Sequence, residues 1–213
     1  QNYTIDRTPP IVDIVDVSPD PRNTAVDSIA ITFDANVDGF NKADLSLTRN
    51  GTNVGLGPAT LDHTGPNYTL SGLTTLTSLP GTYMLTLTAA GSGITDQAGN
   101  ALVTGASDTW IVDTTAPDTA ITATPPNPSN SGTATFSFTG DDGGGTGVAG
   151  FECQIDGGGF VACTSAQTYN SLADGSHTVD VRAVDAASNA DPTPASYTWV
   201  VDTTPPGTTI ISN

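Results

Sequence analysis

One short phrase recurs three times in this chain of 213 residues, and it restricts the fold more than any other feature. An apolar run leads into an aspartate, a nearby threonine and a proline, as in "TWIVDTTAP" at residues 109–117. Asp6, Asp113 and Asp202 hold the same place in the phrase and are separated by 107 and 89 residues. Because each interval fits one β-sandwich domain of about 100 residues, the chain is predicted to repeat one folding unit.

Other segments keep the same register. "IAITFD" ends 107 residues before "FSFTGD" ends, and "DQAGN" begins 89 residues before "DAASN". Several independent matches in one register indicate tandem repeats that are joined in a rod-like array. The predicted divisions are residues 9–115 for the first domain, 116–204 for the second, 1–8 for the last strand of a preceding repeat and 205–213 for the start of a following one.

Short alternating stretches such as "SIAITF" and "HTVDVRAV" are typical of half-buried strands, and no long apolar stretch has helical period. Seven or so short strands per repeat predict an all-β chain of two tandem immunoglobulin-like β-sandwich domains. The predicted strands are 11–17, 27–33, 44–49, 67–71, 82–89 and 108–113, then 119–124, 133–139, 150–155, 159–163, 166–170, 176–184 and 196–202. The predicted inward side chains are Ile29, Ile31, Phe33, Tyr83, Leu85, Leu87 and Trp110, then Phe136, Phe138, Val179, Val181, Ala183 and Trp199.

The two cysteines flank a glycine-rich turn in "FECQIDGGGFVAC". Cys153 and Cys163 share parity with Phe151, Ile155 and Val161, so both are expected to face the core, opposite each other. We predict a disulfide across this hairpin, with two free buried thiols as the alternative. A disulfide favours an oxidising, extracytoplasmic setting.

Charge excludes several functions. The chain carries 5 Lys and Arg against 22 Asp and Glu, for a net charge of −17. It therefore has no basic surface for nucleic acid or for anionic membranes. No apolar run is long enough to span a bilayer, so membrane insertion is not expected. A strongly acidic chain is typical of a protein that binds cations or that must stay soluble in salt.

The "DTTAP" and "DTTPP" linkers, the "DQAGN" loop and "GTYMLTLTAAGSGITDQAGNAL" resemble tandem bacterial immunoglobulin-like domains of the Big type. The second repeat, with "DGSHTVDVRAVDAASNADPTPASYTW", is similar to a common subtype. The resemblance implies a stalk within a large extracellular adhesin or surface repeat protein, with calcium stiffening the joints. It implies a bacterial cell-surface location and neighbouring repeats or subunits as partners. Ser188 stands where the loop pattern has glycine.

Aspartates recur at three places that the predicted topology brings to one end of each sandwich. These places are the entering linker, the loop after the second strand and the loop before the last strand. Calcium takes about six to eight oxygen ligands of this kind. The alternative is that these side chains cap turns by accepting backbone N–H groups. The predicted metal ligands are Asp6, Asp34, Asp96, Asn100, Asp113, Asp141, Asp142, Asp185, Asn189 and Asp202.

Catalysis is not expected, because the sequence pairs no nucleophile with a base. His63 is expected to be solvated in a turn, and His177, which aligns with Tyr83, to pack or to form a corner hydrogen bond. The leading hypothesis is a structural spacer of a surface adhesin or extracellular filament. The alternatives are a fibre subunit that is joined by strand addition and a module that binds a host or matrix glycan or protein through its loops.

Overall fold

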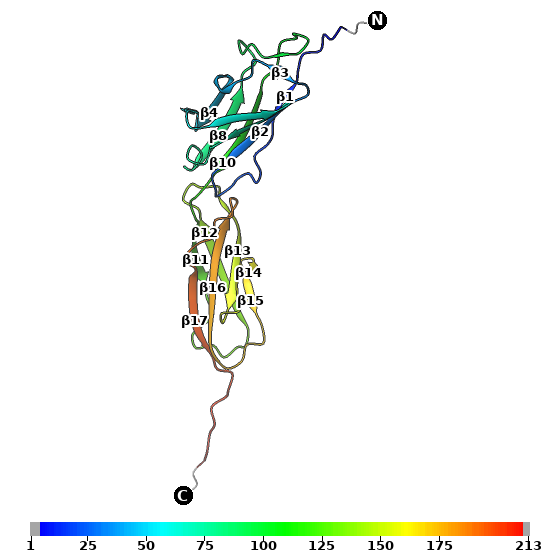
Figure 1. Cartoon of the computed structure of the whole chain (residues 1–213). Coiled ribbons are helices and arrows are strands. Elements are labelled where there is room, and N and C mark those ends of the chain that lie inside the picture. The colour runs from blue at the N-terminus through cyan, green and yellow to red at the C-terminus, as the bar shows by residue number, and fades with distance from the viewer. Residues whose placement is uncertain (1–4, 211–213) are drawn as a thin grey trace. The chain divides into compact units, whose positions relative to one another are not determined.

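The computed structural model describes residues 5–210 and divides the chain into two compact units, residues 1–114 and residues 115–213 (Figure 1). We call these the first unit and the second unit. The expected strands at residues 1–8 and 205–213 extend into residues outside the described range, and described residues 5–8 and 205–210 form no strand. Within residues 5–210, no helix has the length and apolar character needed to cross a membrane.

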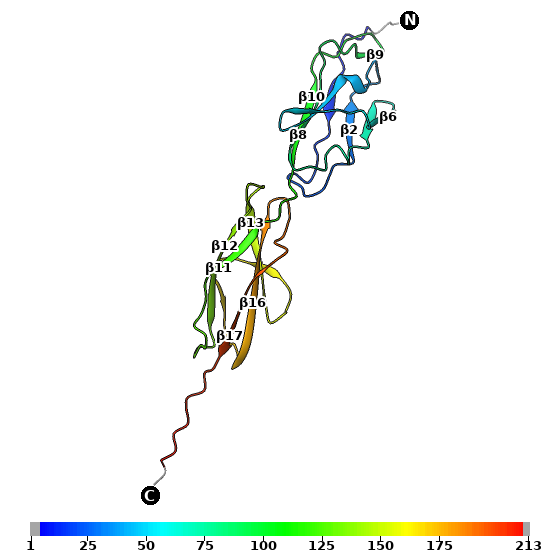
Figure 2. The same cartoon turned by 90° about the vertical axis from the view of Figure 1, so that its left-hand side faces the viewer.

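The first unit is built from two antiparallel sheets, in the orders β1-β2-β7-β6 and β10-β8-β4-β5, and a small β3-β9 pair. Strand β6 forms an edge of its sheet and lies at the margin of the unit in Figure 2. The elements are β1 (Val12–Ile14), β2 (Ser28–Phe33), β3 (Val37–Asp38), the 3-10 helix η1 (Lys42–Asp44), β4 (Leu45–Arg49), β5 (Thr52–Val54), β6 (Thr60–Thr64), β7 (Asn67–Ser71), β8 (Gly81–Leu87), β9 (Thr95–Asp96) and β10 (Ala106–Val112).

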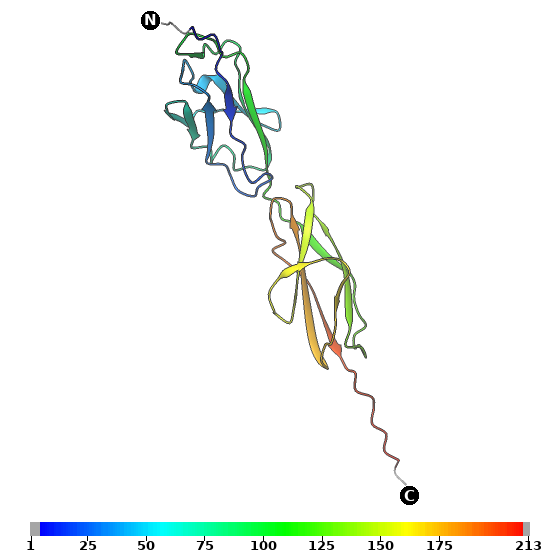
Figure 3. The same ribbon diagram turned by 90° about the vertical axis from the view of Figure 1, so that its right-hand side faces the viewer.

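The second unit pairs a three-stranded sheet, β11-β12-β15, with a four-stranded sheet, β14-β13-β16-β17. Strand β16, drawn in orange, runs along most of this unit (Figure 3). The elements are β11 (Asp118–Ala123), β12 (Ala134–Asp141), β13 (Val148–Ile155), β14 (Val161–Cys163), β15 (Gln167–Tyr169), β16 (Gly175–Asp185) and β17 (Ala195–Val201). The prediction of an all-β chain with two immunoglobulin-like sandwiches is confirmed.

Alternation along the strands places the core where the sequence predicted it. All thirteen side chains that were expected to face inward are buried. Each unit centres on one tryptophan, Trp110 in the first and Trp199 in the second, and both side chains are fully buried. Their burial, with that of the surrounding aliphatic side chains, is the main force that holds each sandwich together.

The predicted disulfide between Cys153 and Cys163 is confirmed. Its position differs from the prediction, because Cys153 pairs with Val161 across the β13–β14 ladder, whereas Cys163 pairs with Phe151. Val161, which shares parity with the two cysteines, is 66% exposed. The reason is that β14 is a three-residue edge strand, and Val161 lines an open hollow together with the disulfide and Tyr169 of β15.

Each unit covers the edge of its last strand with the segment that follows its first strand. In the first unit Asp20 Oδ1 accepts the Ile111 N–H at 2.8 Å, and Arg22 forms a parallel bridge to Val112. In the second unit Asn127 Oδ1 accepts the Val200 N–H at 3.0 Å, and Ser129 bridges Val201. These segments satisfy strand edges that would otherwise invite pairing with another chain.

His63 was expected in a turn, but it lies in β6 and stacks on Tyr68 with ring centroids 4.8 Å apart. The sequence map also lacked β6, whose side chains are mostly exposed and whose alternation is therefore weak. The short strands β3, β5 and β9 were missed because two or three residues carry no period.

Candidate metal centre

The loop before the last strand of the first unit is a turn organised by Asp96. Its Oδ1 accepts the N–H groups of Ala98 at 2.9 Å and Asn100 at 2.8 Å, and its Oδ2 accepts the Asn100 side-chain amide at 2.8 Å. The hydrogen bond from the Asn100 side chain is the main reason that the pKa of Asp96 lies below its ordinary value. Asp96 is thus held as a carboxylate, and its backbone partners are those of a capped turn.

The second unit repeats this turn at Asp185. Asn189 donates its N–H to Oδ1 of Asp185 at 2.7 Å and its side-chain amide to Oδ2 at 2.6 Å. Ser188 replaces Gly99 of the first unit, yet it adopts the same left-handed backbone, with φ of 71° against 85°. The departure from the glycine pattern therefore leaves the turn intact, although a serine is less comfortable there than a glycine.

The loop after β12 supplies the second acidic group of this unit. Asp141 is exposed and caps the turn through Oδ1, which accepts the Gly143 N–H at 3.0 Å. Asp142 is buried, and its Oδ2 accepts the Gly147 N–H at 2.6 Å. One carboxylate oxygen of Asp142 lies within 4.8 Å of one carboxylate oxygen of Asp185, which is also buried. Of the two candidates in this loop, Asp142 is therefore the one that meets the late turn.

The first unit arranges its predicted ligands differently. Asp34 Oδ1 accepts the Ile11 N–H at 2.8 Å, and Asp6 Oδ1 accepts the Thr8 N–H at 2.9 Å, so both carboxylates cap backbone. The side chain of Asn100 reaches the backbone carbonyl of Asp6 at 3.4 Å. Among the described residues of this unit, the carboxylates of Asp6, Asp34 and Asp96 do not gather into a group of three within 4.8 Å.

The linker aspartates share one backbone role. The Asp113 N–H donates to the Arg22 carbonyl at 2.8 Å, and the Asp202 N–H donates to the Ser129 carbonyl at 2.8 Å. Asp202 also caps the next turn, since its Oδ1 accepts the Thr204 N–H at 3.1 Å. Each linker aspartate thus ends the bridge that covers the last strand of its unit. A metal-binding role for Asp113 and Asp202 stays a prediction.

The Asp142–Asp185 pair has the chemistry of a hard-cation site. Two ionised carboxylates that are buried this close repel each other unless a cation or a proton lies between them. Oxygen donors of this kind suit calcium, whereas zinc prefers nitrogen and sulfur ligands. Asp142, Asp185 and the amide oxygen of Asn189 are the residues of the second unit that could hold such an ion.

Sequence reasoning missed another buried aspartate in the same loop region. Asp191 Oδ1 accepts the N–H of Thr193 at 2.8 Å and its hydroxyl at 3.1 Å. Burial raises the pKa of Asp191, but hydrogen bonds from Thr119 and Thr193 outweigh that effect and lower it. The Asp-Pro-Thr sequence at 191–193 was the available signal, because aspartate before such a segment favours an Asx turn.

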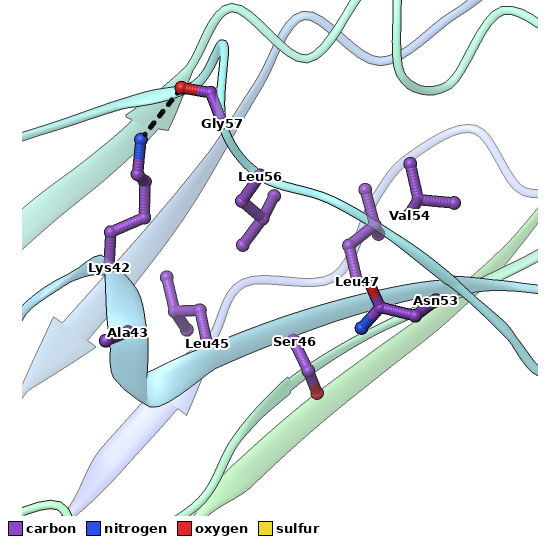
Figure 4. Close-up of a pocket in the computed structure, with 9 residues that line it drawn as sticks. All are labelled: Lys42, Ala43, Leu45, Ser46, Leu47, Asn53, Val54, Leu56 and Gly57. Carbon is purple, nitrogen blue, oxygen red and sulfur yellow. Dashed lines mark hydrogen bonds between the residues drawn. The ribbon is translucent and has the colours of Figure 1, made fainter.

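A hollow of about 330 Å³ in the first unit lies beside β4 and β5 (Figure 4). The core side chains of Leu45, Leu47 and Leu56 form part of its wall. Lys42 donates from Nζ to the carbonyls of Gly57 at 3.1 Å and Ala59 at 2.6 Å. Lys42 therefore fastens the connection between β5 and β6.

Comparison with protein-family models finds no match. Comparison with curated protein sequences finds none either. Among solved structures, the fibronectin(III)-like modules of Clostridium thermocellum CbhA are 19% identical, with 90% of this chain and 94% of that chain covered and a TM-score of 0.42. An I-band fragment of titin is 13% identical, with 91% and 66% covered and a TM-score of 0.44.

A tetra-tandem repeat in the extending region of a large adhesion protein is 20% identical, with 91% of this chain and 49% of that chain covered and a TM-score of 0.34. These values describe distant likenesses. The assignment of the fold rests on the sheet order and core of each unit.

Proposed function

We propose that the chain is a spacer segment of an extracellular bacterial surface adhesin or filament. In this proposal the two sandwiches extend the parent protein, and calcium stiffens the linker that leads into the second unit. No catalytic step is assigned to the chain. The partners are neighbouring immunoglobulin-like repeats.

The observation that carries the proposal is the short connection between two self-contained sandwiches. Strand β10 ends at Val112 and β11 begins at Asp118, so only residues 113–117 connect them. Pro117, the last residue of the DTTAP linker, restricts the backbone of this connection. A chain that repeats a closed domain behind so short a linker is suited to extending a protein rather than to enclosing a substrate.

Calcium is proposed because of the Asp142–Asp185 pair. Asp118 pairs with Asp141 in the β11–β12 ladder, so the linker enters the second unit next to Asp142. Asp113 precedes Asp118 by five residues, which span at most about 17 Å, so its carboxylate can reach the pair. We propose Asp113 as the third carboxylate ligand. The expected affinity is that of extracellular modules, with a Kd of about 10⁻⁴ to 10⁻³ M.

The extracellular setting is supported by the Cys153–Cys163 disulfide, because disulfides persist mainly in oxidising compartments. The net charge of −17 is compatible with a calcium-rich exterior, where bound cations offset repulsion between carboxylates.

Titration calorimetry and scanning calorimetry on the full chain test the proposal, first after treatment with a chelator and then with added calcium. Calcium should bind and raise the melting temperature of the second unit. At a calcium concentration ten times Kd, the free energy of unfolding of this unit should rise by about 1.4 kcal/mol. The double variant Asp142→Asn with Asp185→Asn should abolish both effects, while Asp62→Asn on exposed strand β6 should leave them intact.

Small-angle scattering supplies the mechanical readout. Calcium should narrow the distribution of end-to-end distances in the wild-type chain and leave the double variant unchanged. Absence of both binding heat and a melting shift would remove calcium from the proposal. A broad distance distribution in saturating calcium would remove the stiffening role.

A further inference from the structure

The loop before β8 in the first unit and the loop before β16 in the second are held by the same contact but by different side chains. In the first unit Tyr83 donates its hydroxyl to the Leu79 carbonyl at 2.8 Å. In the second unit His177 Nε2 lies 2.9 Å from the Ala173 carbonyl oxygen, again four residues earlier in the chain. This confirms the corner role expected for His177. A corner in which tyrosine bonds back to upstream backbone is a known feature of immunoglobulin-like sandwiches.

The two rings also occupy the same place against the core. Tyr83 pairs with Trp110 across the β8–β10 ladder and stacks on it with centroids 5.6 Å apart. His177 pairs with Trp199 across the β16–β17 ladder, with centroids 5.7 Å apart. An imidazole therefore replaces a phenol at this corner, and histidine is the side chain whose ordinary pKa lies nearest to neutral pH.

His177 makes a second contact that has no counterpart in the hydrogen bonding of Tyr83. Its Nδ1 lies 2.7 Å from Oδ2 of Asp156, in the turn between β13 and β14. That carboxylate is itself held in place, because its Oδ1 accepts the Thr178 N–H at 2.9 Å. Asp156 also donates its own N–H to the Thr178 carbonyl at 2.8 Å.

Both ring nitrogens of His177 thus face hydrogen-bond acceptors. A neutral imidazole carries one N–H and can satisfy only one of them, whereas the imidazolium carries two. The cation therefore completes both hydrogen bonds and joins the β13–β14 turn to the loop before β16. Loss of the proton leaves a nitrogen lone pair facing either the Ala173 carbonyl or the Asp156 carboxylate.

Asp156 is the charged group that faces the ring. Strand β17 presents Trp199, and the loop before β16 presents the Ala173 carbonyl, while the neighbouring Asp174 is bound to Thr203 and Thr204. The His177 side chain is 13% exposed and that of Asp156 is 47% exposed. The contact is therefore partly screened by solvent, with the ring on the protected side.

We propose that the second unit folds with His177 as a cation, so that removal of this proton as the pH rises weakens the unit. The device is a proton-dependent clasp between a hairpin turn and a loop. It depends on neither calcium nor the spacer role. Its chemistry belongs to residues of the second unit alone.

The direction of the pH effect follows from the contacts. The Ala173 carbonyl and the Asp156 carboxylate raise the pKa of His177 above its ordinary value, against the opposing effect of burial. A group whose pKa is higher in the folded state adds stability that is complete below about pH 6.5, its unfolded value. That stability is lost as the pH rises through the folded pKa.

Burial raises the pKa of Asp156, but hydrogen bonds from His177 and Thr178 outweigh it, so the net shift is downward. The Asp156 contribution is therefore present above its unfolded pKa of about 3.9 and is lost as the pH falls through its folded value. The clasp is therefore closed at pH values between the folded pKa of Asp156 and the folded pKa of His177.

The test uses the full chain with a chelator present, so that metal binding cannot contribute. Proton NMR follows His177 between pH 5 and 9, with His63 as the second histidine in the same spectrum. Urea unfolding at pH 5.5 and 8.5 is followed through amide peaks of each unit. We expect a His177 midpoint above 6.5 and a folding equilibrium constant of the second unit that falls about tenfold for each pKa unit of that shift.

His177→Tyr gives the second unit the same tyrosine corner as the first and removes the imidazole. The pH dependence that comes from His177 should therefore disappear. Asp156→Asn keeps the shape of the turn and should lower the His177 midpoint, which provides a readout if His177→Tyr fails to fold. A midpoint at or below 6.5, or an unchanged pH dependence in a folded His177→Tyr chain, would overturn the proposal.

Discussion

The phenolic oxygen of Tyr83 lies 2.8 Å from the carbonyl oxygen of Leu79 and fixes the end of the loop that leads into β8. The ring of Tyr83 is fully buried against Trp110, so the hydroxyl is the one polar group that the tyrosine brings into the core. The corner therefore couples loop conformation to core packing.

Tyr83→Phe should lower the free energy of unfolding of the first unit by about 1 kcal/mol, because it removes one hydrogen bond and leaves the Leu79 carbonyl without this partner. Urea unfolding followed by NMR peaks of each unit would measure the loss and show the second unit unchanged. The matched control is Tyr197→Phe, whose hydroxyl contact to the Pro125 carbonyl is long, at 3.4 Å. An equal loss in the two variants would contradict the corner interpretation.

Reduction of the Cys153–Cys163 disulfide should lower the free energy of unfolding of the second unit by about 2–3 kcal/mol. This is the stabilisation expected from a disulfide between cysteines ten residues apart in sequence. The double variant Cys153→Ala with Cys163→Ala should lose at least as much, since Cys153 is buried in the core. Thermal unfolding with and without reductant measures the effect. The first unit contains no cysteine and serves as the internal control.

Asp174 ties the segment that leaves the second unit to the loop before β16. Its Oδ1 accepts the Thr203 N–H at 2.9 Å and the Thr203 hydroxyl at 2.6 Å, and its Oδ2 accepts the Thr204 hydroxyl at 2.7 Å. Asp174→Ala should release this segment, and heteronuclear NOE values of the Thr203 and Thr204 amides should fall. Asp62→Ala on β6 is the control that should leave them unchanged.

The same tether should depend on pH. The hydrogen bonds from Thr203 and then Thr204 lower the pKa of Asp174, so the tether is complete above about pH 3.9 and is lost as the pH falls through the folded value. Amide NOE values recorded from pH 6 to pH 2 would show the release. Retention of high values at pH 2 would contradict a carboxylate tether.

Gly105→Ala should destabilise the first unit by about 1–3 kcal/mol or more, because an added Cβ would overlap the Leu87 carbonyl oxygen. The overlap involves backbone on both sides, so it cannot be relieved by a side-chain rotation. Gly55→Ala is the matched control, since an added Cβ there meets nothing within 4 Å. Thermal melts of the two variants should differ by several degrees, and equal melts would contradict the close approach.

Local alternation was enough to predict much of the architecture. The strands that contain Ile31, Leu85 and Val181 have side-chain period two over five or more residues, and a buried face makes that period visible. The disulfide was also predictable, because the two cysteines share parity and flank a glycine-rich hairpin turn. Strand β6 was not predictable, because Leu61 is its only partly buried side chain and the other four are exposed, so the sequence shows no alternation.

The acidic residues show where sequence alone stops. Equal spacing matched Asp34 to Asp141, and both of these carboxylates cap backbone. It is the neighbouring Asp142 whose carboxylate approaches Asp185. Spacing along a chain does not determine the direction of a side chain within a turn. That direction depends on which N–H groups the loop brings within reach of the carboxylate.

The sequence by itself determined the repeat, the sandwich class, the core positions and the disulfide, because these follow from periodicity along single strands and from short-range pairing. The tertiary structure decided which distant polar groups meet. Asp156 lies just after β13, and His177 lies in β16, 21 residues further along the chain. They meet because the β13–β16 ladder, in which Ile155 pairs with Val179, brings the end of β13 beside the start of β16.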